Sequence, residues 1–492
     1  MRLNLSLDNP ADYRKFLRIK SLPSFRFVGR TADFPDEYAG LIIGEEREVA
    51  EVIYEPRPFL FDYQRDIAAL AIQKRKFCVF ADCGLGKTLI FLEFLRAANS
   101  VLPPGKAILI ASPLMVIPQT IAECKRFYGD EIQLEQVRAK DLPGWMLSGG
   151  RFGITNYEAM REGVNQGRLG ALVLDESSML KSHYGVWGSK CMEIGRGLQW
   201  KMCCTGTPAP NDRIEYANHA VFMDAYPTIN SFLSRFFVNR GDKGQWCLKP
   251  HGLVDFYRSL GHFSIFLTNP ATYGWKDHSS DIPPVHTHIH EVPTTAEQDR
   301  LVHQKSGALI VTAGDNGIVG RIKWSGIAKG WDGKEEVPTN KYKFIRALVD
   351  SWPDESTIIW CEYNKEQDYL EHEFPEAASI RGTTSDEARL RLIADFKAGR
   401  RRIIITKPRI LGFGLNLQVA TRQVFSGLHD SYEKYYQAVK RSNRVGSTKP
   451  LNVHIPVTDL ERPMVDNVLQ KADRVQIDTE YQERMFKDAR IA

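Results

Sequence analysis

The stretch Ala81-Asp82-Cys83-Gly84-Leu85-Gly86-Lys87-Thr88 decides how this chain is interpreted. It follows the apolar residues 77–80 and precedes residues 89–96, which lack glycine and proline and are long enough for a helix. A strand, a glycine-rich turn and a helix are the context in which a phosphate-binding loop is expected. Gly84 and Gly86 can adopt positive φ and let the bare backbone approach a ligand. The alternative is an ordinary glycine-containing turn before a core helix.

Each part of this loop has a predicted role in binding ATP. The amides that open the following helix would point at a phosphate, helped by the helix dipole. Lys87 is predicted to pair with the outer phosphates, and the Thr88 hydroxyl to hold Mg²⁺. The predicted nucleotide-binding residues of the loop are Gly84, Leu85, Gly86, Lys87 and Thr88.

A second motif follows a predicted buried strand. Residues 171–174 are four consecutive apolar residues, typical of a parallel sheet, and Asp175 and Glu176 come at the carboxyl end, where such sheets carry their sites. Asp175 is predicted to hold Mg²⁺ through water and to contribute to nucleotide binding, and Glu176 to orient and polarise the attacking water. The alternative is an acidic cap on the next helix. Gln64, upstream of the loop, has an amide suited to the edge of adenine.

Composition describes an ordinary globular chain with more than one domain. The 492 residues predict about two to four domains. The net charge of +5 permits a nucleic-acid partner without requiring one. The eight cysteines contain no Cys-x-x-Cys pair and are interpreted as reduced thiols. The sequence contains no signal peptide and no apolar stretch of about 18 residues, so a cytoplasmic protein without a membrane partner is expected.

Strands and helices alternate along most of the chain, which predicts an α/β fold of two doubly wound parallel-sheet domains with a helical insertion between them. Predicted strands lie at residues 107–111, 152–157, 201–205, 357–361, 402–406 and 451–457. Predicted helices lie at 117–127, 364–374 (with Asn364 as its cap), 384–396 and, with a basic face, 432–444.

The remaining segments have weaker patterns. Residues 41–43 are strand-like, and residues 213–280 are dense in aromatic side chains, which favours a helical insertion. His286, His288 and His290 alternate, as in the polar face of a linker strand or, alternatively, a metal site. The predicted parts are an appended segment 1–55, an ATP-binding domain 56–212, a helical protrusion and linker 213–293, a second domain 294–458 and a helical brace 459–492.

The order of motifs over residues 56–458 resembles the superfamily-two helicases, and among them the Swi/Snf-related translocases on double-stranded DNA. The most discriminating stretch is 437–447, because spaced arginines followed by glycine are typical of these translocases. Ser177-Ser178 departs from the family, which usually has Ala-His there. The compact chain is similar to members encoded by bacteriophages and prophages, which implies a bacterial or phage-infected cell. The matching stretches are 62–64, 81–88, 112–113, 155–158, 175–176, 205–211, 358–363, 412–417 and 437–447.

This resemblance implies two RecA-like domains that face each other across an ATP cleft. Arg441 and Arg444 of the second domain would stabilise charge on the γ-phosphate, with Lys87 and Glu176 as the other catalytic residues. Gly414 would contribute to nucleotide binding. A basic helix face is the alternative for the two arginines.

The resemblance also implies contacts with DNA. Phosphate contacts carry no sequence information, so little sequence preference and a strong salt dependence are expected. The main partner would be double-stranded DNA, with single-stranded DNA or RNA as further options, and the chain would be a monomer, with a partner protein as an option. The candidate nucleic-acid contacts are Ser112, Thr155, Asn156, Thr383 and Lys407.

Three other functions share parts of this pattern. A strand-separating DNA or RNA helicase would carry the same motifs. An ATP-gated nucleic-acid clamp would turn over negligibly, which the intact Lys87, Glu176 and arginine pair argue against. A motor subunit of a restriction or defence complex would need a partner to supply the nuclease.

Overall fold

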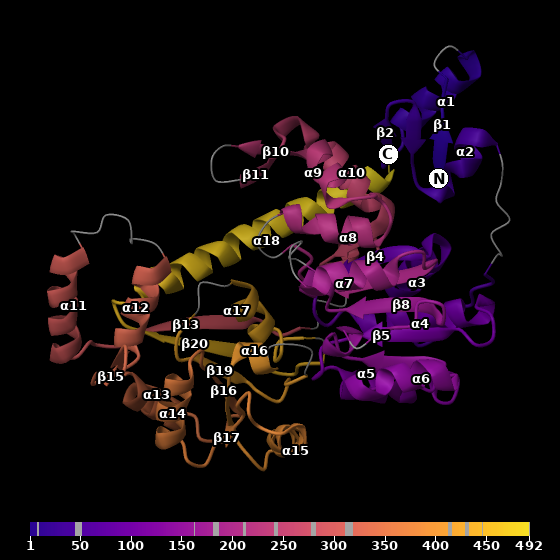
Figure 1. Ribbon diagram of the computed structural model, residues 1–492. Coiled ribbons are helices and arrows are strands. Elements are labelled where there is room, and N and C mark those ends of the chain that lie inside the picture. The colour runs from indigo at the N-terminus through magenta and orange to yellow at the C-terminus, as the bar shows by residue number, and fades with distance from the viewer. Residues whose placement is uncertain are drawn as a thin grey trace. The chain divides into compact units, whose positions relative to one another are not determined.

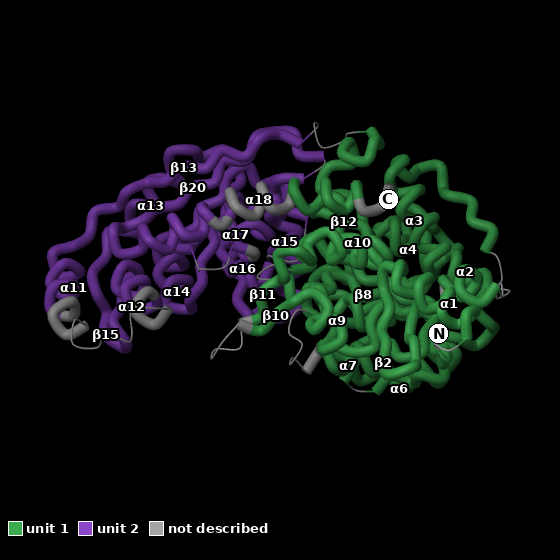
Figure 2. Tube along the Cα trace, turned by 90° about the horizontal axis from the view of Figure 1, so that it is seen from above, with its two compact units in different colours: residues 1–277, 479–492 green, residues 278–478 purple. Residues whose placement is uncertain are grey.

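The chain is divided into two compact units (Figure 2). Unit 1 comprises residues 1–277 and 479–492, and unit 2 comprises residues 278–478. The computed structural model describes residues 1–6, 9–44, 52–161, 163–180, 186–209, 213–240, 245–276, 282–309, 318–411, 416–428, 432–444 and 446–491. None of the helices within these ranges is long and apolar enough to cross a membrane.

Unit 1 is built on a seven-stranded sheet with the order β12-β4-β9-β8-β5-β7-β6. Figure 1 labels β4, β8 and β5 of this sheet. Every neighbouring pair is parallel, so all the strands end at the same edge of the sheet. The strands are β4 (Lys76–Ala81), β5 (Ala107–Ala111), β6 (Glu135–Gln136), β7 (Phe152–Thr155), β8 (Leu169–Asp175), β9 (Trp200–Thr205) and β12 (Ser264–Leu267).

Helices cover both faces of this sheet, because the strand side chains alternate between two apolar clusters. Phe77 and Val79 of β4 pack in one cluster, with residues of α3 (Asp62–Lys74), α4 (Lys87–Val101) and α5 (Ile117–Tyr128). Cys78 and Phe80 pack in the other, with the remaining helices. These are α6 (Leu142–Ser148), α7 (Val186–Gly195), α8 (Tyr216–Phe222), α9 (Ile229–Phe236) and α10 (Leu253–Phe263). The predicted doubly wound sheet is confirmed.

The N-terminal segment of unit 1 forms a small antiparallel sheet of its own, in the order β1-β3-β2. The strand-like pattern at residues 41–43 is misleading, because these residues lie in the helix α2 (Ala39–Ile43), which ends at Gly44 with a positive φ of 73°. Three apolar residues are too few for periodicity to distinguish a helix from a strand. The other elements are β1 (Arg2–Asn4), α1 (Pro10–Lys20), β2 (Arg26–Val28) and β3 (Thr31–Asp33).

The aromatic-rich segment after residue 213 is only partly helical. Besides α8, α9 and α10 it contains the hairpin of β10 (Phe237–Arg240) and β11 (Gln245–Leu248), and its strand β12 joins the large sheet as an edge strand beside β4. A four-residue apolar strand cannot be separated from buried helix by its pattern. The end of α18 (Arg462–Ile491) completes unit 1, since Phe486 is buried in the cluster under α8 to α10.

Unit 2 is built on a second, six-stranded parallel sheet with the order β13-β20-β19-β16-β18-β17. Apolar residues of α13 (Lys341–Asp350) and α14 (Asn364–Glu373) pack on one side of its central strands. Tyr363 is the cap of α14 and Asn364 its first residue, so the predicted cap is wrong by one position. The strands are β13 (Val285–Glu291), β16 (Thr357–Trp360), β17 (Ala378–Ser379), β18 (Ile403–Thr406), β19 (Arg422–Phe425) and β20 (Leu451–Val457).

The other elements of unit 2 surround this sheet. The short pair β14 (Trp331–Asp332) and β15 (Glu335–Glu336) forms an antiparallel ribbon. The helices are α11 (Ala296–Leu309), α12 (Ile318–Ala328), α13 (Lys341–Asp350), α14 (Asn364–Glu373), α15 (Asp386–Lys397), α16 (Pro408–Leu411) and α17 (Tyr432–Val439), followed by the first part of α18.

The alternating histidines lie on β13, an edge strand of this sheet. His290 Nε2 lies 2.9 Å from His454 Nδ1, and His288 Nε2 lies 3.0 Å from Asn452 Oδ1. The rings of His288 and His290 both stack on His454. Among the described residues, no group of three or more His, Cys, Asp or Glu side chains is arranged to hold a metal ion. His288 and His290 therefore contact residues of the neighbouring strand β20.

A buried group of charges lies inside unit 2. Glu461 contacts the ammonium groups of both Lys341 and Lys329, the latter at 3.7 Å, and Lys329 lies 3.9 Å from Glu366. All four side chains are almost completely buried. We expect Glu461→Ala to lower the free energy of unfolding by about 3–5 kcal/mol, because two buried ammonium groups lose a shared carboxylate. Urea unfolding of the purified variant measures this change.

The matched control is an exposed ion pair of the same unit. Arg346 Nε lies 2.9 Å from Asp350 Oδ2, with Arg346 half-buried and Asp350 exposed. Asp350→Ala should change stability by no more than about 1 kcal/mol. An equal loss of stability in Glu461→Ala and Asp350→Ala would contradict a special contribution of the buried charges to folding.

Candidate ATP-binding site

The phosphate loop joins β4 to α4, and its two glycines have the predicted left-handed backbone. φ is 92° at Gly84 and 67° at Gly86, the residue that precedes α4. A Cβ atom at position 86 would lie only 2.2 Å from Gln64 Nε2. Glycine is favoured there by the left-handed backbone, and a larger residue would also displace the Gln64 amide.

Gln64 supports the loop from α3. Its Oε1 accepts a hydrogen bond from the Phe61 amide at 3.0 Å, and its Nε2 donates to the Leu85 carbonyl at 3.3 Å. The Tyr63 hydroxyl donates to the same carbonyl at 3.2 Å. The predicted adenine contact of Gln64 stays a prediction; the described contacts hold the loop. Tyr63 lies in the matching stretch 62–64 but was not among the predicted site residues.

Lys87 lies at the start of α4, and its Nζ donates to the carbonyls of Ala81 at 2.9 Å and Asp82 at 3.2 Å. Burial lowers the pKa of Lys87, but the surrounding groups more than offset this effect, so the pKa is raised overall. In order of size these groups are Cys83, Glu176, Asp82 and Asp175. The charges of the loop and of the strand β8 therefore act on one another.

Asp175 and Glu176 lie at the carboxyl end of β8, separated from β4 by β9 alone. Burial, and then the charge of Glu176, raise the pKa of Asp175 to about 7, while a hydrogen bond from Ser112 and the charge of Lys87 oppose the shift. The Ser112 hydroxyl donates to Asp175 Oδ2 at 2.9 Å. The Tyr157 hydroxyl donates to the backbone carbonyl of Asp175 at 2.7 Å. The structure thus brings the two predicted carboxylates to the same sheet edge as the loop.

Gly86→Ala tests the tight fit of the loop. We expect a loss of about 1–3 kcal/mol in stability from the left-handed backbone, and weaker ATP binding because Gln64 must move. Thermal unfolding and nucleotide titration measure the two effects. Gly129→Ala is the control, since Gly129 also has positive φ but nothing lies within 4 Å of the place that a Cβ atom would take there. Equal ATP affinity in both variants would contradict the proposed contact.

Two predicted nucleic-acid residues have fully buried side chains. Ser112 donates to Asp175, as described above, and Thr155 Oγ1 donates to the Val137 carbonyl at 2.7 Å. Their hydroxyls therefore point into the protein, and a side-chain contact with a phosphate is not supported for Ser112 or Thr155. The motif pattern fixes their place after a strand but not the direction of the side chain.

The other three predicted nucleic-acid residues differ from one another. Lys407 is buried, and its ammonium contacts Asn364 Oδ1, so it too is directed into the protein. Asn156 is half-buried, and its Oδ1 accepts from the Ala159 amide at 3.1 Å. Thr383 is exposed. The predicted nucleic-acid contact remains open for Asn156 and Thr383.

The two predicted catalytic arginines belong to unit 2. The predicted helix over 432–444 is too long, because α17 ends at Val439 and both arginines follow it. Arg441 is almost completely buried, and its Nε donates to the Gln437 carbonyl at 3.0 Å. Arg444 is half-buried. Gly414, the remaining predicted nucleotide-binding residue, lies outside the described residues.

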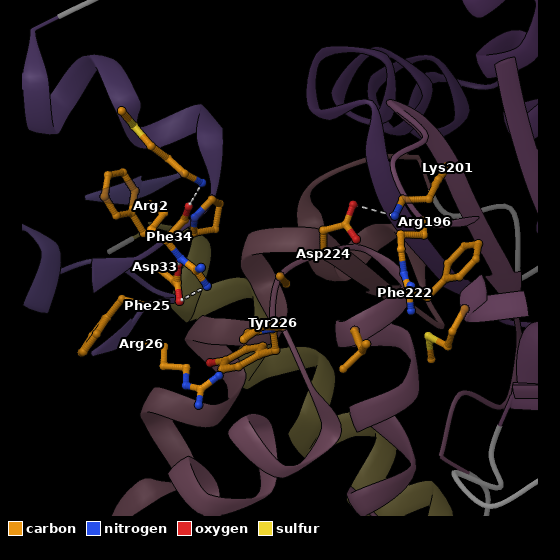
Figure 3. A pocket seen from close by; sticks show the side chains of 16 residues that line it. Arg2, Phe25, Arg26, Asp33, Phe34, Arg196, Lys201, Phe222, Asp224 and Tyr226 are labelled. Atoms are coloured by element: carbon orange, nitrogen blue, oxygen red, sulfur yellow. Dashed lines mark hydrogen bonds and ion pairs between the residues drawn. The ribbon is translucent and has the colours of Figure 1, made fainter. Parts of the chain in front are cut away.

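A cavity of about 490 Å³ in unit 1 lies elsewhere (Figure 3). Arg2 pairs with Asp33 on one side of it, and Lys201 pairs with Asp224 on the other. Lys201 lies near the amino end of β9, whereas the phosphate loop follows the carboxyl end of β4. The cavity is therefore at the opposite edge of the sheet and takes no part in the candidate ATP site.

Comparisons with known proteins show what this chain is similar to. Residues 340–446 match the family model of the helicase conserved C-terminal domain. Protein p41 of Acyrthosiphon pisum secondary endosymbiont phage 1 is 24% identical over 454 residues, covering 82% of this chain and 92% of that protein. The ATP-dependent DNA helicase DDM1 of Arabidopsis thaliana is 24% identical over 445 residues, covering 75% of this chain and 55% of that protein.

A solved structure is also similar to this chain. It is the SWI2/SNF2 ATPase core of Sulfolobus solfataricus in complex with double-stranded DNA, with 18% sequence identity and a TM-score of 0.40. The similarity covers 91% of this chain and 97% of the other.

The two parallel-sheet domains and the helicase match define a nucleic-acid-dependent ATPase with two RecA-like domains. Within that class the comparisons support a likeness to the Snf2-related helicases of superfamily two and to a phage protein. The resemblance predicted from the motifs is confirmed.

Proposed function

We propose that this chain is an ATP-dependent translocase on double-stranded DNA, which moves along or remodels the duplex and displaces bound proteins. The observation that carries the proposal is the gathering of Lys87, Asp175 and Glu176 at one edge of the first sheet, in a chain whose second unit matches the helicase C-terminal domain. The Arabidopsis relative, named a DNA helicase, supports DNA as the substrate.

The chemistry of the first unit fits ATP hydrolysis. When ATP binds, the Lys87 ammonium would exchange the carbonyls of Ala81 and Asp82 for the outer phosphates. The amides at the start of α4 would bind oxygens of the same phosphates. Glu176 would orient the attacking water and take its proton. The Ser112 bond would hold the carboxylate of Asp175 in one orientation.

Mg²⁺ fits the oxygen ligands present. The Thr88 hydroxyl and the Asp175 carboxylate are of the kind that Mg²⁺ prefers. The raised pKa of Asp175 means that this buried carboxyl gains from a nearby positive charge. When bound there, Mg²⁺ would neutralise charge on the phosphates.

The proposed DNA contact is to the phosphate backbone. It would have little sequence preference and fall steeply with salt, as expected for neutralisation of phosphates by basic groups. Thr383, which is exposed, and Asn156 are the predicted contacts that the structure leaves accessible.

The test is ATP hydrolysis by the full chain with no nucleic acid, single-stranded DNA, blunt duplex DNA or duplex RNA. Strong stimulation by blunt duplex DNA supports the translocase. Stimulation by single strands or by RNA alone would overturn it in favour of a strand-separating helicase. No stimulation by any of them would instead point to a clamp or to a motor subunit that needs a partner.

A further inference from the structure

The backbone at Glu176 has an uncommon conformation. Its φ is 50°, in the left-handed region that residues with side chains rarely adopt. Such a conformation persists only where the surrounding structure holds it, and it is common at functional sites. The neighbours that hold this turn are therefore part of how the Glu176 carboxyl is placed.

Two sets of hydrogen bonds hold the turn. On the strand side, the Tyr157 hydroxyl binds the Asp175 carbonyl at 2.7 Å. On the other side, the Ser177 hydroxyl lies 3.0 Å from His219 Nε2, and both residues are fully buried. His219 belongs to α8, and its neighbour Asn218 donates to the Leu180 carbonyl at the end of the same turn. Helix α8 therefore forms hydrogen bonds with the first and last residues of the turn, Ser177 and Leu180.

The imidazole of His219 is suited to a fixed hydrogen bond. Burial lowers the pKa of His219 to about 4, against a smaller opposing effect of the nearby backbone of Glu215 and Ser177. The ring is thus neutral at neutral pH and can accept the Ser177 hydroxyl hydrogen at Nε2. The edge of one ring meets the face of the other between His219 and Phe80 on β4, with centroids 5.1 Å apart, which also fixes the imidazole.

We infer that His219, acting through Ser177, is a positioning residue that holds Glu176 in its hydrolytic arrangement. The inference rests on the proposed role of Glu176 as the residue that activates water. An alanine at position 177 could not form the hydrogen bond that links this turn to α8.

The first test is Ser177→Ala, assayed for ATP hydrolysis with the most stimulating nucleic acid. Loss of one buried hydrogen bond at the turn is expected to lower kcat about tenfold, with KM for ATP nearly unchanged, because the loop that binds ATP is untouched. His219→Gln, which keeps an amide able to bond with Ser177, should retain more of kcat than Ser177→Ala.

Ser259→Ala is the matched control. Ser259 is also fully buried in unit 1, and its hydroxyl bonds to an aromatic side chain, Tyr226, at 2.8 Å. Both serine variants should lose similar stability in urea, but only Ser177→Ala should lose kcat. Equal kcat in the two variants would overturn the inference.

A double variant separates this inference from the proposed function. In a Glu176→Gln background, Ser177→Ala should cost nothing further, because Ser177 acts through the carboxylate that is already lost. Independent, multiplicative losses would overturn the inference. If Glu176→Gln alone left hydrolysis unchanged, the proposed role of Glu176 would fail first.

Discussion

Replacing Glu176 by glutamine is expected to lower kcat for ATP hydrolysis about 10²–10⁴-fold, the usual contribution of general base catalysis. The amide keeps the size and most of the hydrogen bonding of the side chain but cannot accept a proton from water. Binding of ATP should persist, because the phosphate loop and Lys87 are unchanged. Single-turnover hydrolysis and titration with a fluorescent ATP analogue measure the two properties separately.

Glu215→Gln is the control for this change. Glu215 lies in the same unit and is 8% exposed, against 9% for Glu176. Its replacement should leave kcat within about twofold of the wild type. Glu215 is buried to a similar extent but has no proposed role at the phosphates, so its loss should not affect the transition state. If Glu176→Gln retained wild-type kcat, the assignment of the water-activating residue would be wrong.

Replacing Arg444 by alanine is expected to lower kcat about 10³–10⁵-fold, as loss of a guanidinium at the γ-phosphate does in other nucleotide hydrolases. Arg444 is the better candidate of the predicted pair, since Arg441 is almost completely buried and bonded to Gln437. Stability should change little at the half-buried Arg444. Steady-state hydrolysis and thermal unfolding together measure both outcomes.

Arg441→Ala should show the reverse pattern, with a clear loss of stability from a buried hydrogen-bonding group and the cavity left behind. A folded Arg441→Ala protein with normal stability and abolished hydrolysis would show that the buried arginine, not Arg444, acts on the phosphate. Normal hydrolysis in both variants would show that neither does.

The phosphate loop and the Asp175–Glu176 pair could be predicted because each is a continuous stretch whose strand, turn and polar residues are adjacent in sequence. The contacts that orient them could not be. Ser112 and Asp175 are 63 positions apart, and Ser177 and His219 are 42 apart. Motif spacing also placed Ser112 toward nucleic acid, although its hydroxyl turns to Asp175, because a pattern of residues does not specify side-chain direction.

The prediction of helix and strand boundaries failed in places for a different reason. The four residues of β12 and the run at 41–43 are too short for periodicity to decide between helix and strand. The basic pattern from 432 to 444 continues beyond the end of α17, because charged residues favour a helix without requiring one. The strand β8 could be predicted because two carboxylates directly follow its apolar run at 171–174, as at the end of a parallel strand.

The cysteines at the centre of the first sheet have a practical consequence for chemical labelling. Cys78 and Cys204 are fully buried, and burial raises the pKa of both thiols well above the usual value, so neither offers the thiolate that alkylating reagents attack. Cys83, in the phosphate loop, is only half-buried. A maleimide dye should therefore modify Cys83 in preference to the central thiols, and ATP should slow that reaction. A dye attached to Cys83 would therefore report whether ATP occupies the loop.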